Sequence, residues 1–147
     1  MELIVERWFN GPVTLAGLRG RVVLVYAFQM RCLGCVEHSI PQAKRAHASF
    51  PADRVQVIGL HTVFENHDAQ SADALTAFVA EHDLHFPIGI DSPAPGESMP
   101  RTMRLYDMQG TPTLIAIDKR GLRRRQHLGH LDDAQLEGLV DALVAED

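Results

Sequence analysis

The sequence predicts an α/β domain in which helices cover both faces of a mixed β-sheet. Two segments, residues 22–28 and 55–60, are continuously apolar and rich in valine, as is typical of strands buried on both faces. The segments that follow them, residues 36–50 and 71–82, instead place apolar side chains at helical spacing. Because strands that alternate with helices usually pair in a sheet between two helical layers, we expect a three-layer α/β/α arrangement.

The second half of the chain adds strands that complete this sheet. Residues 86–90 predict a short strand, and residues 113–118 predict another buried one. A turn at residues 119–121 then leads into a paired strand, so the last two strands form a hairpin. Asp132 and Gln135 have the spacing of a capping box and open a final helix.

The whole chain, residues 1–147, is expected to form one domain, because its length suits a single core. Residues 1–14 are weakly patterned and predict an N-terminal extension or a short strand. Residues 61–100 predict an inserted helix, a strand and a Pro-rich loop, with Ser71 as the N-cap of the helix. We interpret the Pro-rich loop as a surface connection rather than a lid.

Composition excludes several classes of function. The chain carries a net charge of -5, so nucleic-acid binding has no electrostatic support. Its basic run at residues 119–125 is expected to be a solvated turn and strand edge. No apolar run approaches the ~20 residues that span a membrane, and the N-terminus lacks the pattern of a signal peptide. We therefore expect a cytoplasmic protein with no membrane partner.

Cys32 and Cys35, the only cysteines, lie where a buried strand gives way to a helix. Cys32 is expected just before the helix, where unpaired N–H groups and the positive end of the helix dipole favour a thiolate. Cys35 lies one turn further and should be more shielded. An exposed thiolate with a second thiol behind it can attack a disulfide and then be released by its neighbour.

Three other interpretations of the cysteine pair are less favoured. A structural disulfide would close only a two-residue loop and would stabilise the fold little. A metal site could use Cys32, Cys35 and His38, but no second ligand pair follows at a typical spacing. An inert buried pair conflicts with the place of Cys32 at a helix start. We expect redox chemistry, no metal and no cofactor beyond the cysteine pair itself.

The residues around the two cysteines resemble the active-site entry of thioredoxin-like proteins, and most closely the TlpA/ResA-type thiol–disulfide oxidoreductases. Residues 106–121, with Gly-Thr-Pro-Thr before a strand, are similar to that family's cis-proline segment and final hairpin. The resemblance implies a thioredoxin fold, with Cys32 as the attacking thiolate and Cys35 as the resolving thiol. It also implies that Pro112 is cis and that Thr111 offers backbone hydrogen bonds to an extended substrate.

The chain departs from the family pattern in places that bear on mechanism. Thioredoxins proper carry a buried Asp in the first strand, where this chain has Tyr26. ResA-like members use a Glu after the second strand, and Glu65 stands in a matching place. Glu65 could relay a proton to or from Cys35, or it could be an exposed loop carboxylate. The helix proline, Pro41, lies six residues after the second cysteine rather than five. It removes one backbone hydrogen bond from the helix and is expected to kink it.

These features together predict a thiol–disulfide oxidoreductase that reduces disulfides of protein or small-molecule substrates. Its partners would be such a substrate and a thiol system that donates electrons. One alternative is a redox-sensing binding module that forms the same disulfide without turnover. A peroxiredoxin-type peroxidase is less favoured, because that family's Pro and Thr before the reactive cysteine are replaced by Val25 and Gln29.

Overall fold

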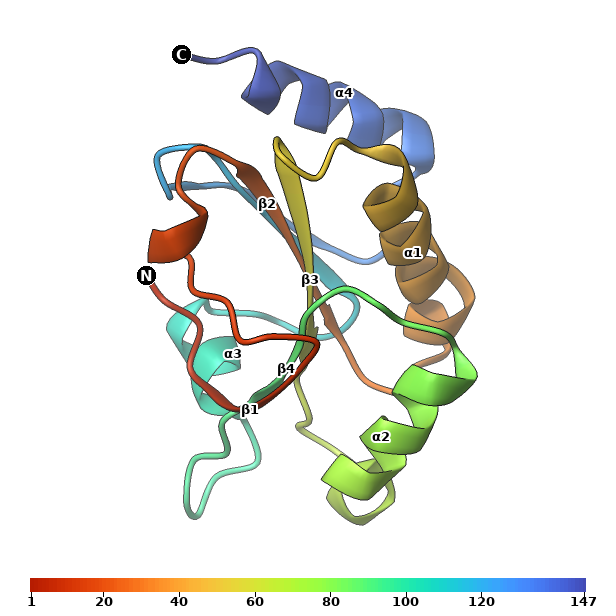
Figure 1. Ribbon diagram of the computed structural model, residues 1–147. Helices are drawn as coiled ribbons and strands as arrows, with labels where there is room; N and C mark the ends of the chain where they lie inside the picture. Colours follow the sequence, from red (N-terminus) through yellow and green to blue (C-terminus); the bar gives the residue numbers. More distant parts are fainter.

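A computed structural model describes residues 1–147 and contains a six-stranded sheet with the order β1-β4-β3-β2-β5-β6 (Figure 1). The central strand β2 runs parallel to β3 and antiparallel to β5, so the sheet is mixed, as predicted. The strands are β1 (Val5–Phe9), β2 (Val22–Phe28), β3 (Val55–His61), β4 (Ile88–Asp91), β5 (Thr113–Ile117) and β6 (Arg123–Leu128).

Helices of unequal size cover the two faces of the sheet. The larger layer consists of α1 (Ile40–Ser49), α2 (Ala72–Glu81) and α4 (Asp133–Val144), which lie together on one side in Figure 1. The other side carries α3 (Arg101–Leu105) and a 3-10 turn at Ala16–Leu18. The predicted α/β fold with three layers is therefore confirmed, although the second helical layer is thin.

The buried strand β2 divides its side chains between these two layers. Every residue from Val22 to Phe28 is buried, and successive side chains point to opposite faces. Tyr26 and Phe28 pack in the larger core with α1, α2 and α4, whereas Val25 and Ala27 pack in the smaller one with residues of α3. This double burial explains the continuous apolar run in the sequence.

The N-terminal stretch contributes an edge strand. β1 pairs antiparallel with β4, within the residues 1–14 expected to be an extension or a short strand. Thr102 fixes the chain just before β1, because it accepts a hydrogen bond from the Ile4 N–H (2.8 Å) and donates one to the Ile4 carbonyl (3.0 Å). Several β1 side chains are exposed, which explains the weak pattern.

The predicted helix caps are confirmed. The Ser71 hydroxyl accepts a bond from the Ala74 N–H at 3.2 Å. Asp132 and Gln135 form a complete capping box, with bonds of 2.8 and 3.2 Å. No helix is both long enough and apolar enough to cross a membrane.

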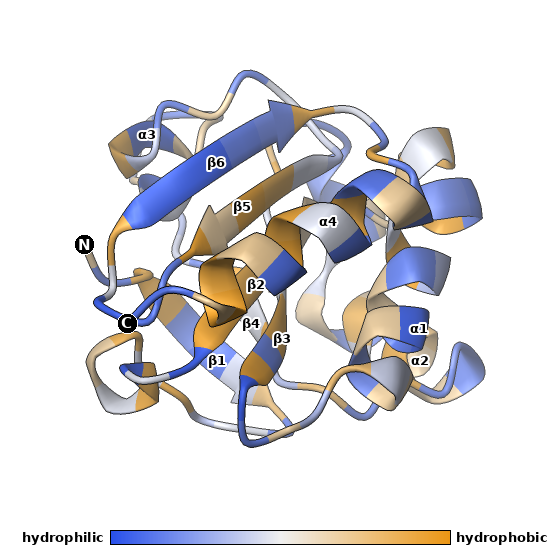
Figure 2. Cartoon of the chain, turned by 90° about the horizontal axis from the view of Figure 1, so that it is seen from above, coloured by the Kyte–Doolittle hydropathy of each residue, from blue (hydrophilic) through white to orange (hydrophobic).

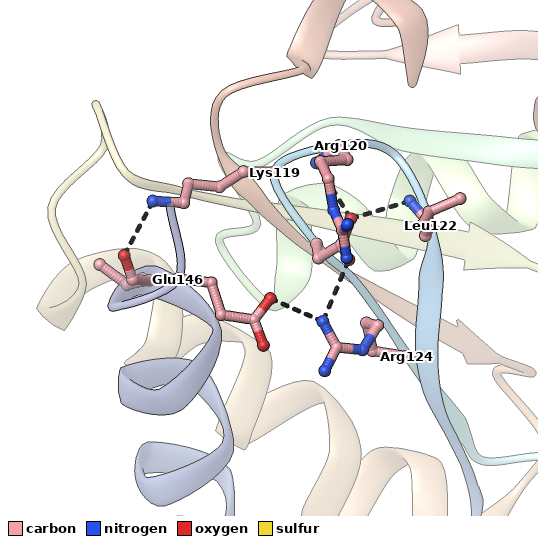
Figure 3. Close-up of polar contacts among 7 residues, drawn as sticks. Lys119, Arg120, Leu122, Arg124 and Glu146 are labelled. Carbon is pink, nitrogen blue, oxygen red and sulfur yellow. Dashed lines mark hydrogen bonds and ion pairs between the residues drawn. The ribbon is translucent and has the colours of Figure 1, made fainter.

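The basic run forms a hairpin turn that is anchored on one buried carboxylate. Asp118 accepts bonds from the backbone N–H groups of Arg120 (2.9 Å) and Leu122 (3.0 Å), and from the Arg124 guanidinium (3.2 Å). Arg124 also contacts Glu146 at 2.6 Å, which ties the hairpin to the C-terminus (Figure 3). The edge strand β6 that follows is strongly hydrophilic in Figure 2, so the expected solvated strand edge is confirmed.

Candidate active site

The two thiols lie at the junction between β2 and the following helix, with opposite exposure. Cys35 is completely buried, whereas Cys32 is partly exposed. The Cys32 carbonyl accepts the Val36 N–H at 3.1 Å, and its Sγ accepts the Cys35 N–H at 3.4 Å. Cys32 thus occupies the position of a capping residue, where a side-chain acceptor pairs with a free N–H of the first turn. The predicted arrangement of a thiol at a helix start and a shielded second thiol is confirmed.

The first full turn after the pair is a π-helix, Cys35–Ser39, rather than a kinked α-helix. The Ile40 N–H bonds to the carbonyl of Cys35, five residues back. Pro41 follows at the start of α1 and cannot donate a backbone bond of its own. Because a π turn encloses one residue more than an α turn, it accommodates the extra residue between Cys35 and Pro41.

Burial dominates the chemistry of the inner thiol. Burial, together with a smaller effect of the adjacent Cys32 thiol, raises the pKa of Cys35 from its ordinary value of 9.0 to about 12. The Gln29 backbone and the Thr111 side chain act on the pKa of Cys35 in the opposite direction. Cys35 therefore stays protonated near neutral pH unless the groups around it favour its thiolate.

Thr111 and Pro112 come from the loop before β5 and lie directly against the cysteines. The peptide bond between them is cis, and the Pro112 ring packs on the loop between the cysteines, since a methyl group at Gly34 would be 3.5 Å from Pro112 Cδ. The Cys32 thiol donates to the Thr111 carbonyl at 3.5 Å. The Thr111 N–H makes no hydrogen bond within the protein, so it is free to meet a ligand.

Glu65 does not join this cluster. Its side chain is exposed, and only its backbone carbonyl takes part in a nearby contact, as acceptor of the Gln70 amide at 2.9 Å. This is the placement expected of a loop carboxylate, and the proton-relay role stays a prediction. Tyr26, which stands where thioredoxins proper carry Asp, bonds to Gln42 at 3.0 Å, and burial raises the pKa of its hydroxyl above the ordinary value.

His38 likewise forms no hydrogen bond with the thiols. It is exposed, and its ring packs in a tilted arrangement against His130, with ring centroids 4.9 Å apart. No three side chains of His, Cys, Asp or Glu form a group that could hold a metal ion.

Sequence reasoning missed two polar residues beside the site. Gln29 and Gln70 are 1% and 5% exposed, and their amides are 3.2 Å apart. Gln29 also bonds to the Thr111 hydroxyl, and Gln70 accepts the Arg31 N–H, each at 3.2 Å. The available signal was a polar residue immediately after a strand that is buried on both faces. Such a residue needs buried partners.

Comparison with known proteins agrees with this geometry. A crystal structure of the thioredoxin-like superfamily protein SPOA0173 superimposes with a TM-score of 0.97 and 46% identity, covering 100% of this chain and 96% of that one. A thiol-disulfide isomerase from Corynebacterium glutamicum gives 0.97 and 42%, with the same coverage. Thiol-disulfide oxidoreductase ResA of Bacillus cereus (strain ZK / E33L) is 26% identical over 133 residues, which are 90% of this chain and 69% of ResA.

Fold, cysteine pair and relatives together define a thioredoxin-fold thiol–disulfide oxidoreductase of the TlpA/ResA type. The sequence model of the AhpC/TSA family matches residues 3–124. The chain belongs to this family.

Proposed function

We propose that this protein reduces disulfide bonds of protein or peptide substrates, with Cys32 as the attacking residue and Cys35 as the resolving residue. The observation that carries the proposal is the pairing of a partly exposed thiol with a fully buried one, next to the Thr111–Pro112 loop. An exposed first thiol can reach a bulky disulfide, and a buried second thiol is kept from competing for it.

In the first step, the Cys32 thiolate attacks one sulfur of the substrate disulfide. A bond forms between Cys32 Sγ and that sulfur, the substrate S–S bond breaks, and the other substrate sulfur leaves with the electron pair as a thiolate. The Cys35 N–H that bonds to Cys32 Sγ at 3.4 Å can stay in place while the sulfur is charged. The bond to the Thr111 carbonyl must break, because only a protonated thiol can donate it.

In the second step, Cys35 loses its proton and its thiolate attacks Cys32 Sγ. The Cys32–substrate bond breaks, and the remaining substrate sulfur leaves with the electron pair. Two electrons have then passed to the substrate, and the enzyme holds a Cys32–Cys35 disulfide. A reduced dithiol from an electron-donor system must return the pair to the thiol state before the next turnover.

The surface around Cys32 supports a peptide as substrate. The free N–H of Thr111 can bond to an extended chain, as a strand does at a sheet edge. Leu33, between the cysteines, is 71% exposed, and Pro112 is partly exposed beside it. An apolar surface formed by Leu33 and Pro112 next to the Thr111 N–H suits a segment of polypeptide better than a small hydrophilic disulfide.

Reduction of a protein disulfide by single variants tests the proposal. We expect Cys32→Ser to lose all turnover, and Cys35→Ser to accumulate a covalent adduct with the substrate that mass spectrometry detects. The wild-type protein must also turn over many substrate molecules with excess donor dithiol. If the protein is oxidised by one equivalent of substrate disulfide and the reaction then stops, the proposal is contradicted and a redox-sensing module is indicated.

Peroxide reduction is the alternative that the family assignment brings forward. Val25 and Gln29 stand at the positions where the peroxiredoxin pattern has Pro and Thr, and both are buried. Neither supplies the hydroxyl of that pattern next to Cys32. We expect peroxide consumption to stay at the level of the Cys32→Ser variant.

The predicted cytoplasmic location would make substrate reduction the net direction.

A further inference from the structure

A pair of buried glutamines connects three segments that frame the cysteines. Gln29 is at the end of β2, three residues before Cys32, and Gln70 belongs to the segment after β3. Through these two amides, the approach to Cys32 is bonded to the loop at residues 64–70 and to Thr111.

Backbone groups fix the orientation of both amides. The Phe64 N–H donates to Gln29 Oε1 at 3.3 Å, and the Arg31 N–H donates to Gln70 Oε1 at 3.2 Å. A backbone N–H can only donate, so each must face a side-chain oxygen. The Nε2 of Gln70 therefore donates to Gln29 Oε1 (3.2 Å), and the Nε2 of Gln29 is directed to Thr111 Oγ1 (3.2 Å).

This orientation limits what the Thr111 hydroxyl can do. A hydroxyl carries one proton, and its oxygen already accepts the Gln29 amide, so the proton must point to a different acceptor. The Thr111 carbonyl accepts the Cys32 thiol at 3.5 Å, so Thr111 lies beside the cysteine pair, and its side chain lowers the pKa of Cys35. The Thr111 hydroxyl forms no other hydrogen bond with the side chains around it.

Cys35 needs such a donor when it resolves the mixed disulfide. It is completely buried, and burial disfavours its thiolate. Tyr26 holds the place of the thioredoxin Asp but bonds to Gln42, and the Glu65 side chain is exposed. Neither side chain forms a hydrogen bond with Cys35.

We propose that Gln29, held by Gln70, is a positioning residue for the resolving step, because it directs the Thr111 hydroxyl proton towards Cys35 Sγ. Thr111 keeps its proton throughout and donates a hydrogen bond to the thiolate that forms. The Cys35 proton passes to solvent, the new thiolate attacks Cys32 Sγ, and the substrate sulfur leaves with the electron pair. The inference rests on the proposed function of the cysteine pair.

The disulfide reagent 5,5′-dithiobis(2-nitrobenzoate) separates the two steps. Attack by Cys32 releases one coloured thiolate, and resolution by Cys35 releases the second. We expect Gln29→Met, which keeps the size but has no amide, to slow the second release roughly three- to tenfold, the size of one hydrogen bond. Its rate–pH profile should move to higher pH, and the first release should keep its wild-type rate.

Gln42→Met is the matched control. Gln42 is also a buried glutamine with several bonds, but they go to Tyr26 and to the start of α4. Its loss should lower the free energy of unfolding and leave the rate and pH profile of the second release unchanged. A general loosening of the fold would instead affect both variants alike, and that result would overturn the proposal.

A double-mutant cycle with Thr111 completes the test. In a Thr111→Val background, Gln29→Met should have no further effect on the second release, whereas a Thr111→Ser background should keep its response to Gln29→Met. An equal effect of Gln29→Met with and without the hydroxyl, or no effect in the wild-type background, would refute the inference. Wild-type protein that releases only one equivalent would instead refute the proposed function.

Discussion

The buried thiol should be almost inert to alkylation in the folded protein. Burial raises the pKa of Cys35 from 9.0 to about 12, and only the thiolate reacts with iodoacetamide. This rise in the pKa lowers the thiolate fraction about a thousandfold near neutral pH. The complete burial of Cys35 also hinders access of the reagent. We expect reduced protein at pH 8 to gain one adduct, on Cys32, long before a second.

Mass spectrometry of a time course measures both rates. Cys32→Ser isolates the inner thiol, and protection should persist there because burial, rather than the neighbouring thiol, is the largest cause of the shift. Denaturant should remove the protection and give both cysteines similar rates. Parallel alkylation of Cys32 and Cys35 in the folded protein would refute the assignment of their separate roles.

Three further predictions concern residues around the site and the fold. Glu65→Gln should change the disulfide reduction rate by less than about twofold, since exposed carboxylates interact weakly; a large loss would restore the proton-relay hypothesis. His61 is buried, and burial lowers its pKa from 6.5 to about 4. As the pH is lowered from 6.5 to 4, the unfolded state therefore binds a proton that the folded state does not, and the free energy of unfolding decreases. Between pH 7 and pH 4, the free energy of unfolding measured with urea should fall by about 3 kcal/mol more in the wild type than in the His61→Leu variant. An equal fall in the two proteins would contradict this prediction. Asp118→Ala should lower the free energy of unfolding by about 2 kcal/mol. The control Glu97→Gln removes an exposed ion pair with Arg104 and should lower it by less than about 1 kcal/mol. Similar losses in the two variants would contradict the anchoring role of Asp118.

The strongest patterns of the sequence were sufficient to predict the sheet and the cysteine site. The bounds of β2 match the predicted segment 22–28, because a strand buried on both faces leaves a continuous apolar run. Caps at Ser71 and Asp132 were predictable because each bond joins residues only three positions apart. Local physics fixed both features.

Features that depend on distant contacts were not predictable in the same way. The exposure of Glu65 follows from the path of the loop after β3, which no local pattern encodes. The π turn at Cys35–Ser39 was expected only as a kink at Pro41. The bond between Gln70 and Gln29 spans 41 residues, and the bond from Gln29 to Thr111 spans 82, so only the folded chain brings these polar groups together.

The most direct test of the proposed chemistry is a redox titration of the Cys32/Cys35 pair against glutathione or dithiothreitol buffers, followed by alkylation. We predict one reversible two-electron transition with a potential near the roughly -270 mV of thioredoxin, as expected of a disulfide reductase. A transition near about -120 mV would contradict the reducing direction and indicate an oxidant. The absence of any reversible disulfide between Cys32 and Cys35 would contradict the oxidoreductase mechanism itself.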